Sequence, residues 1–201
     1  MMDVYNKLLN RFGHQQWWPA DTPFEVVVGA VLTQQTKWEN VERAIRNLKE
    51  RGLMEPEPLS KAGIPELEML VRCTGFYRQK ANRLKNISGF FSENPDILEK
   101  QGAELRKILL SLNGIGQETA DSIVLYAADK PSFVIDAYTK RICKCLGVEG
   151  DYGELQSVFE GSLPRDVSLY KEFHALIVEY GKQFCGKKRC AECLLVENVK
   201  M

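Results

Sequence analysis

Residues 109–123 read LLSLNGIGQETADSI, and no other segment of the sequence is as informative about the fold. Its apolar residues recur at helical spacing, run into a glycine–isoleucine–glycine turn at 114–116, and resume beyond it. The two glycines permit backbone conformations that side chains forbid, and Ile115 is expected to pack back between the helices. The turn amides would point outward beside the second helix's N-terminus, where a phosphate oxygen binds readily. A plain helix–turn–helix corner closed by glycine is the alternative interpretation.

The chain on both sides of this turn also has apolar residues at helical spacing, so the predicted fold class is all-α. The segment 21–23 (DTP) is expected to cap a helix, Gly52 to end one, and 55–58 (EPEP) to be a connector. The strand-like run 132–135 is too short and isolated to form a sheet. Further helices are predicted at about 65–72, 77–93, 102–111, 117–128, 138–146, 152–161 and 166–182.

The composition is that of an ordinary globular protein. With 201 residues and 44% hydrophobic residues, the chain can bury one large core or form two smaller lobes. The 27 Lys and Arg residues balance 27 Asp and Glu residues, whereas nucleic-acid binders usually have a basic excess. DNA binding would therefore depend on local clusters of lysine and arginine. Taken alone, each cluster is most simply interpreted as a solvated surface. The clusters are Arg78, Lys80, Arg83 and Lys85, and then Lys182, Lys187, Lys188 and Arg189.

No stretch of the sequence indicates a targeting segment or a membrane span. The N-terminus has no charged region followed by a long apolar run, and no later run is long enough to cross a bilayer. A cytoplasmic, nucleoid-associated location without a membrane partner is the resulting expectation.

The turn resembles the hairpin of the helix-hairpin-helix DNA glycosylases typified by endonuclease III. The residues that match are Leu112, Gly114, Ile115, Gly116, Thr119 and Ala120. The family has a catalytic aspartate downstream of the hairpin, and Asp136 lies in that place, twenty residues after Gly116. The resemblance implies two helical lobes with an active-site cleft between them: 22–130, which carries the hairpin, and 1–21 with 131–201. Capping of a helix that begins near Tyr138 is a second, compatible role for Asp136.

Two further segments resemble the parts of this family that enter the DNA stack. Residues 32–36 (LTQQT) resemble the segment that fills the gap left by an extruded nucleotide, with Gln35 inserting. Residues 74–81 (TGFYRQKA) resemble the intercalating wedge, with Phe76 entering the stack. An apolar wedge offsets the unstacking cost of roughly a few kcal/mol per step. The implied partner is double-stranded DNA containing a damaged base, bound by a monomer.

Glu118 stands where strand-nicking members of the family carry a lysine. The lysine amine attacks the sugar to form a Schiff base, and a carboxylate cannot form an imine. The resemblance therefore implies a monofunctional glycosylase without AP-lyase activity. Asp136 would stabilise positive charge developing on the sugar or orient a water toward the anomeric carbon. This chemistry needs no cofactor.

Glu118 together with 17–19 (WWP) and 36–38 (TKW) resembles the bacterial 3-methyladenine DNA glycosylases of the endonuclease III-like branch. An N-alkylated purine is cationic and leaves easily, and indole rings attract a cation by about 0.5–2 kcal/mol each. At least one tryptophan is expected to be a core residue, and Lys182 could instead be an exposed helix-end lysine. Leu176 stands where a compared member of the branch has lysine. The implied pocket is Trp17, Trp18, Pro19, Trp38, Glu118 and Lys182.

Two other functions remain open at this point. The same fold could act on a mismatched or deaminated base: thymine, uracil, or adenine opposite oxidised guanine. The hairpin could also serve as a phosphate clamp in a DNA-binding module without catalytic activity, although that alternative gives no reason for the position of Asp136.

Cys185, Cys190 and Cys193 are concentrated near the end of the chain. Many endonuclease III relatives end with four cysteines that bind a 4Fe-4S cluster, and here a fourth cysteine is missing. Three alternatives stay open: a cluster with an unusual fourth ligand, a site that holds no metal, and a zinc site completed by His174. The sequence favours the site without a cluster.

Overall fold

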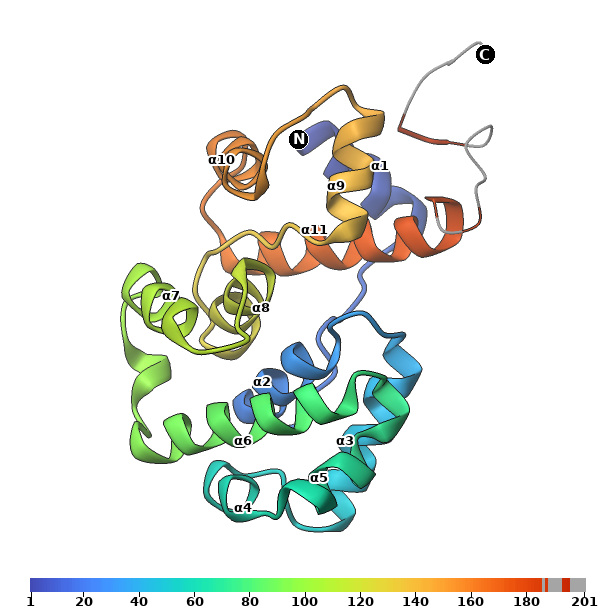
Figure 1. Cartoon of the computed structure of the whole chain (residues 1–201). Coiled ribbons are helices and arrows are strands. Elements are labelled where there is room, and N and C mark those ends of the chain that lie inside the picture. The colour runs from blue at the N-terminus through green and yellow to red at the C-terminus, as the bar shows by residue number, and fades with distance from the viewer. Residues whose placement is uncertain (186, 188–192, 196–201) are drawn as a thin grey trace. The chain divides into compact units, whose positions relative to one another are not determined.

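The computed structural model describes residues 1–185, 187 and 193–195. Its regular elements are all helical, and no strand occurs in these ranges, which confirms the all-α class. The chain divides into two compact units, Ala20–Lys130 and Met1–Pro19 with Pro131–Met201 (Figure 1). The lobe boundaries expected from the sequence are 21/22 and 130/131. None of the described helices has the length and apolar character needed to span a membrane.

The unit 20–130 is built around α2 (Pro23–Leu32). This helix has no polar face, and all residues from Phe24 to Leu32 are buried, as expected of a helix surrounded by others. Thr22 caps it by accepting a hydrogen bond from the Glu25 amide, which confirms the predicted cap. Around α2 the chain forms α3 (Trp38–Glu50), α4 (Pro56–Lys61), α5 (Ile64–Leu70), η1 (Arg72–Thr74), α6 (Tyr77–Glu93), η2 (Ile97–Glu99), α7 (Gly102–Ser111), α8 (Gln117–Ser122) and η3 (Ile123–Ala127).

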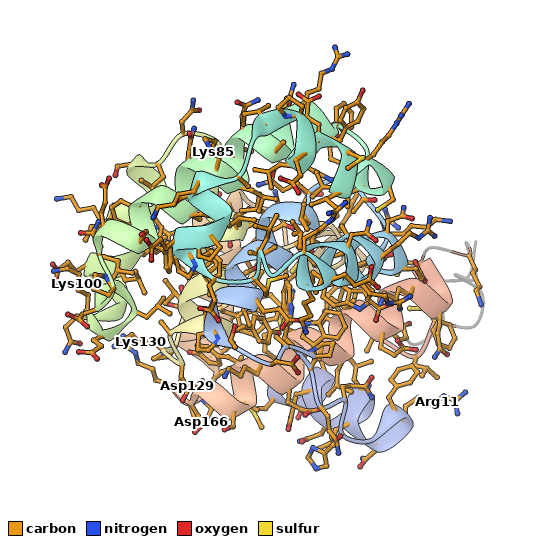
Figure 2. All side chains as sticks on the ribbon, turned by 90° about the horizontal axis from the view of Figure 1, so that it is seen from below. Arg11, Lys85, Lys100, Asp129, Lys130 and Asp166 are labelled. Atoms are coloured by element: carbon orange, nitrogen blue, oxygen red, sulfur yellow. The ribbon has the colours of Figure 1, made fainter. Side chains whose placement is uncertain are left out.

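The expectation that 55–58 is a connector is wrong, because α4 begins at Pro56. Pro56 and Pro58 both fall in the first turn, where backbone amides have no partner within the helix and proline removes nothing. Lys85 of α6 then fixes the end of α4: its ammonium donates to the carbonyls of Ser60 at 2.8 Å and Ala62 at 2.7 Å. Lys85 is labelled in Figure 2.

The two helices of the hairpin are joined by an ion pair. Arg106 of α7 donates from Nε and Nη2 to the two carboxylate oxygens of Asp121 in α8, at 2.7 and 3.0 Å. The Asp121 side chain is fully buried, whereas that of Arg106 is 26% exposed. Two parallel bonds between planar groups fix the relative orientation of the helices as well as their separation. The pair therefore holds the turn at 114–116 in shape.

Replacing Asp121 with alanine is expected to lower the free energy of unfolding by about 3 kcal/mol, because it removes both charge-assisted hydrogen bonds of a buried ion pair. For a chain of this size the melting temperature should fall by roughly 6–12 °C. Glu104→Ala on α7 is the matched control, since its pair with Lys100 is exposed and such pairs contribute below about 0.5 kcal/mol. Equal urea midpoints for the two variants would contradict the assignment.

The other unit contains α1 (Met2–Phe12), α9 (Ala137–Cys145), α10 (Tyr152–Ser162), α11 (Val167–Tyr180) and the π-turn η4 (Gly181–Cys185). The helix α1 was not predicted. The buried helix α11 packs against α1 and α9. The core of this unit is aromatic: the ring of Phe133 stacks on that of Phe159, with centroids 4.2 Å apart, and meets the ring of Phe173 edge-on.

The strand-like run 132–135 forms no strand, as expected. Side chains of α10 replace a neighbouring strand: Phe133 donates from its amide to Glu160 at 2.8 Å and accepts from Gln156 at 2.8 Å. The Ile135 amide donates to the Tyr152 hydroxyl at 3.3 Å. This run leads directly to Asp136, so its anchoring fixes where the aspartate begins α9.

Candidate functional site

The turn of the hairpin has the backbone shape that the glycines predicted. Gly114 has a φ of +86°, and a Cβ there would lie 2.5 Å from Nε of Arg83, so a side chain fits neither the conformation nor the space. Ile115 is 7% exposed and packs inward. Gly116 precedes α8, is exposed, and has no atom within 4 Å of a Cβ built on it. Nothing within the unit therefore requires glycine at position 116.

The two proposed stack-entering side chains share a rare backbone conformation. Gln35 and Phe76 have φ values of +54° and +45°, in the left-handed region that side chains rarely adopt. Both are exposed, and Phe76 is 61% exposed although it is aromatic. Strained, outward-pointing residues tend to mark functional positions. The geometry is thus consistent with insertion roles for both.

Lys80 supports the segment that carries Phe76. Its side chain is buried, and its ammonium donates to the Thr74 carbonyl at 2.7 Å. Burial and the neighbouring charge of Arg83 lower the pKa of Lys80 to about 8. The interpretation of the cations at 78–85 as one solvated face is wrong for Lys80 and Lys85, because each satisfies backbone carbonyls. Of the four, only Arg78 is exposed.

Asp136 is the N-cap of α9, as the sequence predicted. Its Oδ1 accepts hydrogen bonds from the amide of Thr139 at 2.7 Å and from the Thr139 hydroxyl at 2.8 Å. Its Oδ2 lies 3.9 Å from Nε2 of His174 on α11. The carboxylate is thus held in one orientation by the helix start, with its second oxygen toward the imidazole. A charged group fixed in this way can act on a nearby charge without reorganising.

His174 is 5% exposed, and burial lowers the pKa of its imidazole, while the charge of Asp136 opposes the shift. A lowered folded-state pKa means that the unfolded chain binds the proton first. The contribution of neutral His174 to the free energy of unfolding is therefore complete above about pH 6.5. It is lost as the pH falls below that value.

The free energy of unfolding is accordingly expected to fall on acidification below about pH 6.5, by up to about 1.4 kcal/mol per pH unit from this group. His174→Asn should flatten that dependence in urea titrations at pH 5 and 7.5. His14 is the other histidine; its side chain is 72% exposed and its Nδ1 lies 3.5 Å from a carboxylate oxygen of Glu172, so His14→Asn is measured in parallel to separate its share of the dependence. An unchanged slope in the His174 variant would refute the assignment.

Trp17, Trp18 and Lys182 lie together in the unit that carries Asp136. The two indole rings have centroids 5.5 Å apart, and the Lys182 ammonium lies 5.4 Å from the Trp17 ring centroid. A Cβ on Gly181 would come within 2.3 Å of the Tyr138 ring, so this ring packs directly on the backbone beside Lys182. Tyr138 is two residues from Asp136. The contact between α9 and η4 thus joins the aspartate to the tryptophan and lysine pair.

The remaining predicted pocket residues lie at the surface or in the other unit. Trp38 and Glu118 belong to the unit 20–130, where the Trp38 indole donates to Glu42 at 2.8 Å and Glu118 is exposed in the first turn of α8. Pro19 is exposed. The expectation of a core tryptophan is wrong, since Trp17, Trp18 and Trp38 are all partly exposed; Trp17 and Trp18 pack on each other. Leu176 is fully buried in the core.

The cysteine cluster is described only in part, because Cys190 lies outside the described residues. The sulfur of Cys193 accepts a hydrogen bond from the buried Tyr180 hydroxyl at 3.0 Å, and that hydroxyl accepts one from the Leu194 amide. Cys185 ends the π-turn η4. In the ranges described, no three His, Cys, Asp or Glu side chains converge as metal ligands.

Sequence reasoning missed two residues that lie against the hairpin. The side chains of Gln34 and Arg83 contact Gly114 from the turn after α2 and from α6. Neither has a sequence signal of its own: Gln34 precedes the more conspicuous Gln35, and Arg83 is one of several cations on α6. Contacts between segments this far apart appear only in the fold.

Comparisons with known proteins agree with this architecture. Residues 28–160 match the family described as HhH-GPD superfamily base excision DNA repair protein. A provisionally named DNA repair glycosylase of Methanocaldococcus jannaschii is 50% identical, over 96% of this chain and 93% of that protein. Endonuclease III of Thermotoga maritima is 33% identical, over 86% and 80%.

Among solved structures, the 3-methyladenine DNA glycosylase of H. pylori, bound to 1,N6-ethenoadenine, superposes with a TM-score of 0.78. It is 33% identical in sequence, and the alignment covers 90% of this chain and 95% of that one. The family match spans more than half of the chain, and the hairpin and aspartate lie within it. The chain belongs to the HhH-GPD superfamily and is a base excision repair DNA glycosylase.

Proposed function

We propose that this glycosylase is monofunctional and hydrolyses the N-glycosidic bond of alkylated purines of the 3-methyladenine type. The observation that carries the proposal is the Trp17 ring, which attracts the ammonium of Lys182 in the unit of Asp136. An alkylated purine is itself a cation, so the same indole attraction suits it. The likeness to the H. pylori 3-methyladenine glycosylase, at 33% identity, supports the same substrate class.

In the proposed reaction, Asp136 acts on the sugar rather than on the base. The glycosidic bond breaks, its electron pair goes to the cationic purine, and the base leaves neutral. The carboxylate stabilises the positive charge that develops on the sugar, or orients a water whose oxygen bonds to the anomeric carbon. The proton of that water passes to the carboxylate or to solvent. The substrate in this proposal is double-stranded DNA with one damaged base, bound by a monomer.

The other unit supplies the proposed grip on DNA. The turn from Leu112 to Gly116, with Thr119 behind it, binds the backbone through its amides. Phe76 and Gln35 enter the stack where the damaged nucleotide leaves it. Trp38 and Glu118 are proposed as further pocket residues, and so are Trp18 and Pro19. No metal takes part in these steps.

Glu118 provides the test of the missing lyase activity. Because a carboxylate forms no imine, borohydride added during turnover is expected to trap no protein–DNA adduct, and the abasic strand should stay intact until alkali is added. An endonuclease III trapped in parallel is the positive control. A borohydride-stabilised adduct of wild-type protein with methylated DNA would show that another amine serves as nucleophile.

A panel of duplexes tests the choice of base. Single-turnover rates are measured on methylated DNA, on G·T and G·U mismatches, and on adenine opposite 8-oxoguanine. The proposal predicts the highest rate on methylated DNA, with 3-methyladenine released. Release from a mismatch with none from methylated DNA would assign the enzyme to a different base, and binding without release from any duplex would indicate a DNA-binding module.

A further inference from the structure

We propose that Gln34 and Arg83 are positioning residues that lock the hairpin turn to the segment carrying Gln35. The inference rests on the proposed DNA contacts of the hairpin and Gln35. It assigns a role to two side chains, neither of which contacts the base or takes part in the reaction. All of the residues concerned lie within the unit 20–130.

The amide group of Gln34 forms hydrogen bonds at both of its ends. Its Nε2 donates to the Gly114 carbonyl at 3.3 Å and to the Thr119 hydroxyl at 3.0 Å. Its Oε1 accepts a hydrogen bond from Nη1 of Arg83. One side chain thus bonds to the turn, to the helix that follows it, and to α6. A neutral side chain with both donors and its acceptor engaged is rigidly oriented.

Arg83 closes this arrangement from the other side. A Cβ built on Gly114 would lie 2.5 to 2.8 Å from Nε, Cγ and Cδ of Arg83, so the arginine stem lies flat on the turn. Arg83 is partly buried, and its guanidinium donates to the neutral Gln34 rather than extending into solvent. Its charge is therefore directed into the protein, in contrast to exposed Arg78 on the same helix.

The consequence concerns Gln35, the next residue in the chain. Gln34 is partly buried and points toward the hairpin, whereas Gln35 is exposed in the left-handed conformation. Because one planar peptide group joins the Cα atoms of adjacent residues, fixing Gln34 against the hairpin restricts the direction in which the Gln35 side chain leaves the surface. The network thereby fixes the position of the phosphate-binding turn relative to the inserting side chain of Gln35.

The experiment measures DNA binding with a duplex that contains a tetrahydrofuran abasic analogue and 2-aminopurine opposite it. Gln34→Leu keeps the volume and the charge but removes the three bonds. We expect about tenfold weaker binding to this duplex and a smaller 2-aminopurine fluorescence change, since Gln35 no longer inserts in register. Thr119→Val, which removes one bond, should show the same effect in weaker form and guards against a misfolded Gln34 variant.

The salt dependence of DNA affinity and a double variant distinguish a positioning role of Arg83 from a direct contact with DNA. Arg83→Leu should weaken binding to a similar extent while the slope of log K against log salt stays unchanged; loss of a phosphate contact would lower the slope by about 0.9. Gln34→Leu/Arg83→Leu should bind no more weakly than either single variant, because both remove one network. Lys85→Met, which loosens α4 from the same helix, should lower stability without weakening the binding.

A salt slope that falls by about one unit in Arg83→Leu, or single-variant losses that multiply in the double variant, would overturn the proposal. So would wild-type affinity and fluorescence in Gln34→Leu. The readouts require no base release, so they stand or fall separately from the assignment of the alkylated purine.

Discussion

Asp136→Asn is expected to slow base release by about 10²- to 10³-fold, the scale of losing one preorganised electrostatic group. Asparagine keeps the oxygen that accepts from the Thr139 amide and hydroxyl, so α9 stays capped and the fold intact. What disappears is the negative charge that would face the developing positive sugar. Single-turnover release of base from methylated DNA measures the effect, and thermal melting checks the fold.

Asp151→Asn is the matched control for this variant. Asp151 caps α10 in the same unit by accepting from the Glu154 amide at 2.9 Å, so the substitution makes the same chemical change at another helix start. Its base-release rate should equal that of the wild type. If Asp136→Asn retained full activity, or if both variants lost it equally, Asp136 would be a capping residue only.

Gly116→Ala is expected to weaken binding to any duplex by about 10- to 100-fold while leaving stability unchanged. A Cβ at this position meets no protein atom within 4 Å, so the folded chain accommodates alanine. In the proposed complex the methyl group would separate the turn amides from a phosphate, at a cost of about 1.5–3 kcal/mol for a hydrogen bond to a charged group. Fluorescence anisotropy with an undamaged duplex measures the change.

The control for Gly116→Ala is Gly89→Ala on α6. Gly89 also has open space around an added Cβ, and it lies inside a helix where alanine is the better residue. This variant should bind DNA as the wild type does and melt at a slightly higher temperature. A Gly116 variant with wild-type affinity would show that the turn does not approach the DNA backbone.

Local patterns were sufficient to predict most helices and the turn. Apolar residues at helical spacing located α6 at 77–93 and α7 at 102–111, and the segment 21–23 predicted the cap of α2, because these features depend on neighbouring residues alone. The connector at 55–58 was wrong because two prolines are compatible with a first helical turn. The strand-like run 132–135 forms no strand, and its hydrogen-bond partners are side chains of α10 that no local pattern discloses.

Residues of the candidate site could be predicted only where their position in a sequence motif indicates their role. Asp136 follows the hairpin at a fixed spacing, and its cap of α9 could be expected from the sequence. The bracing of the turn by Gln34 and Arg83 could not, since it joins positions separated by 80 residues in one case and by 49 in the other. The burial of Lys80 was equally invisible, because a lysine among other cations usually faces solvent.

The decisive test of base release through Asp136 is incubation of the protein with methylated duplex DNA, followed by chromatography of the released bases. We expect wild type and Asp151→Asn to form free 3-methyladenine at equal rates and Asp136→Asn to form it about 10²- to 10³-fold more slowly, with the DNA strand intact until alkali treatment. Absence of any released methylated base from a folded, DNA-binding preparation would contradict it.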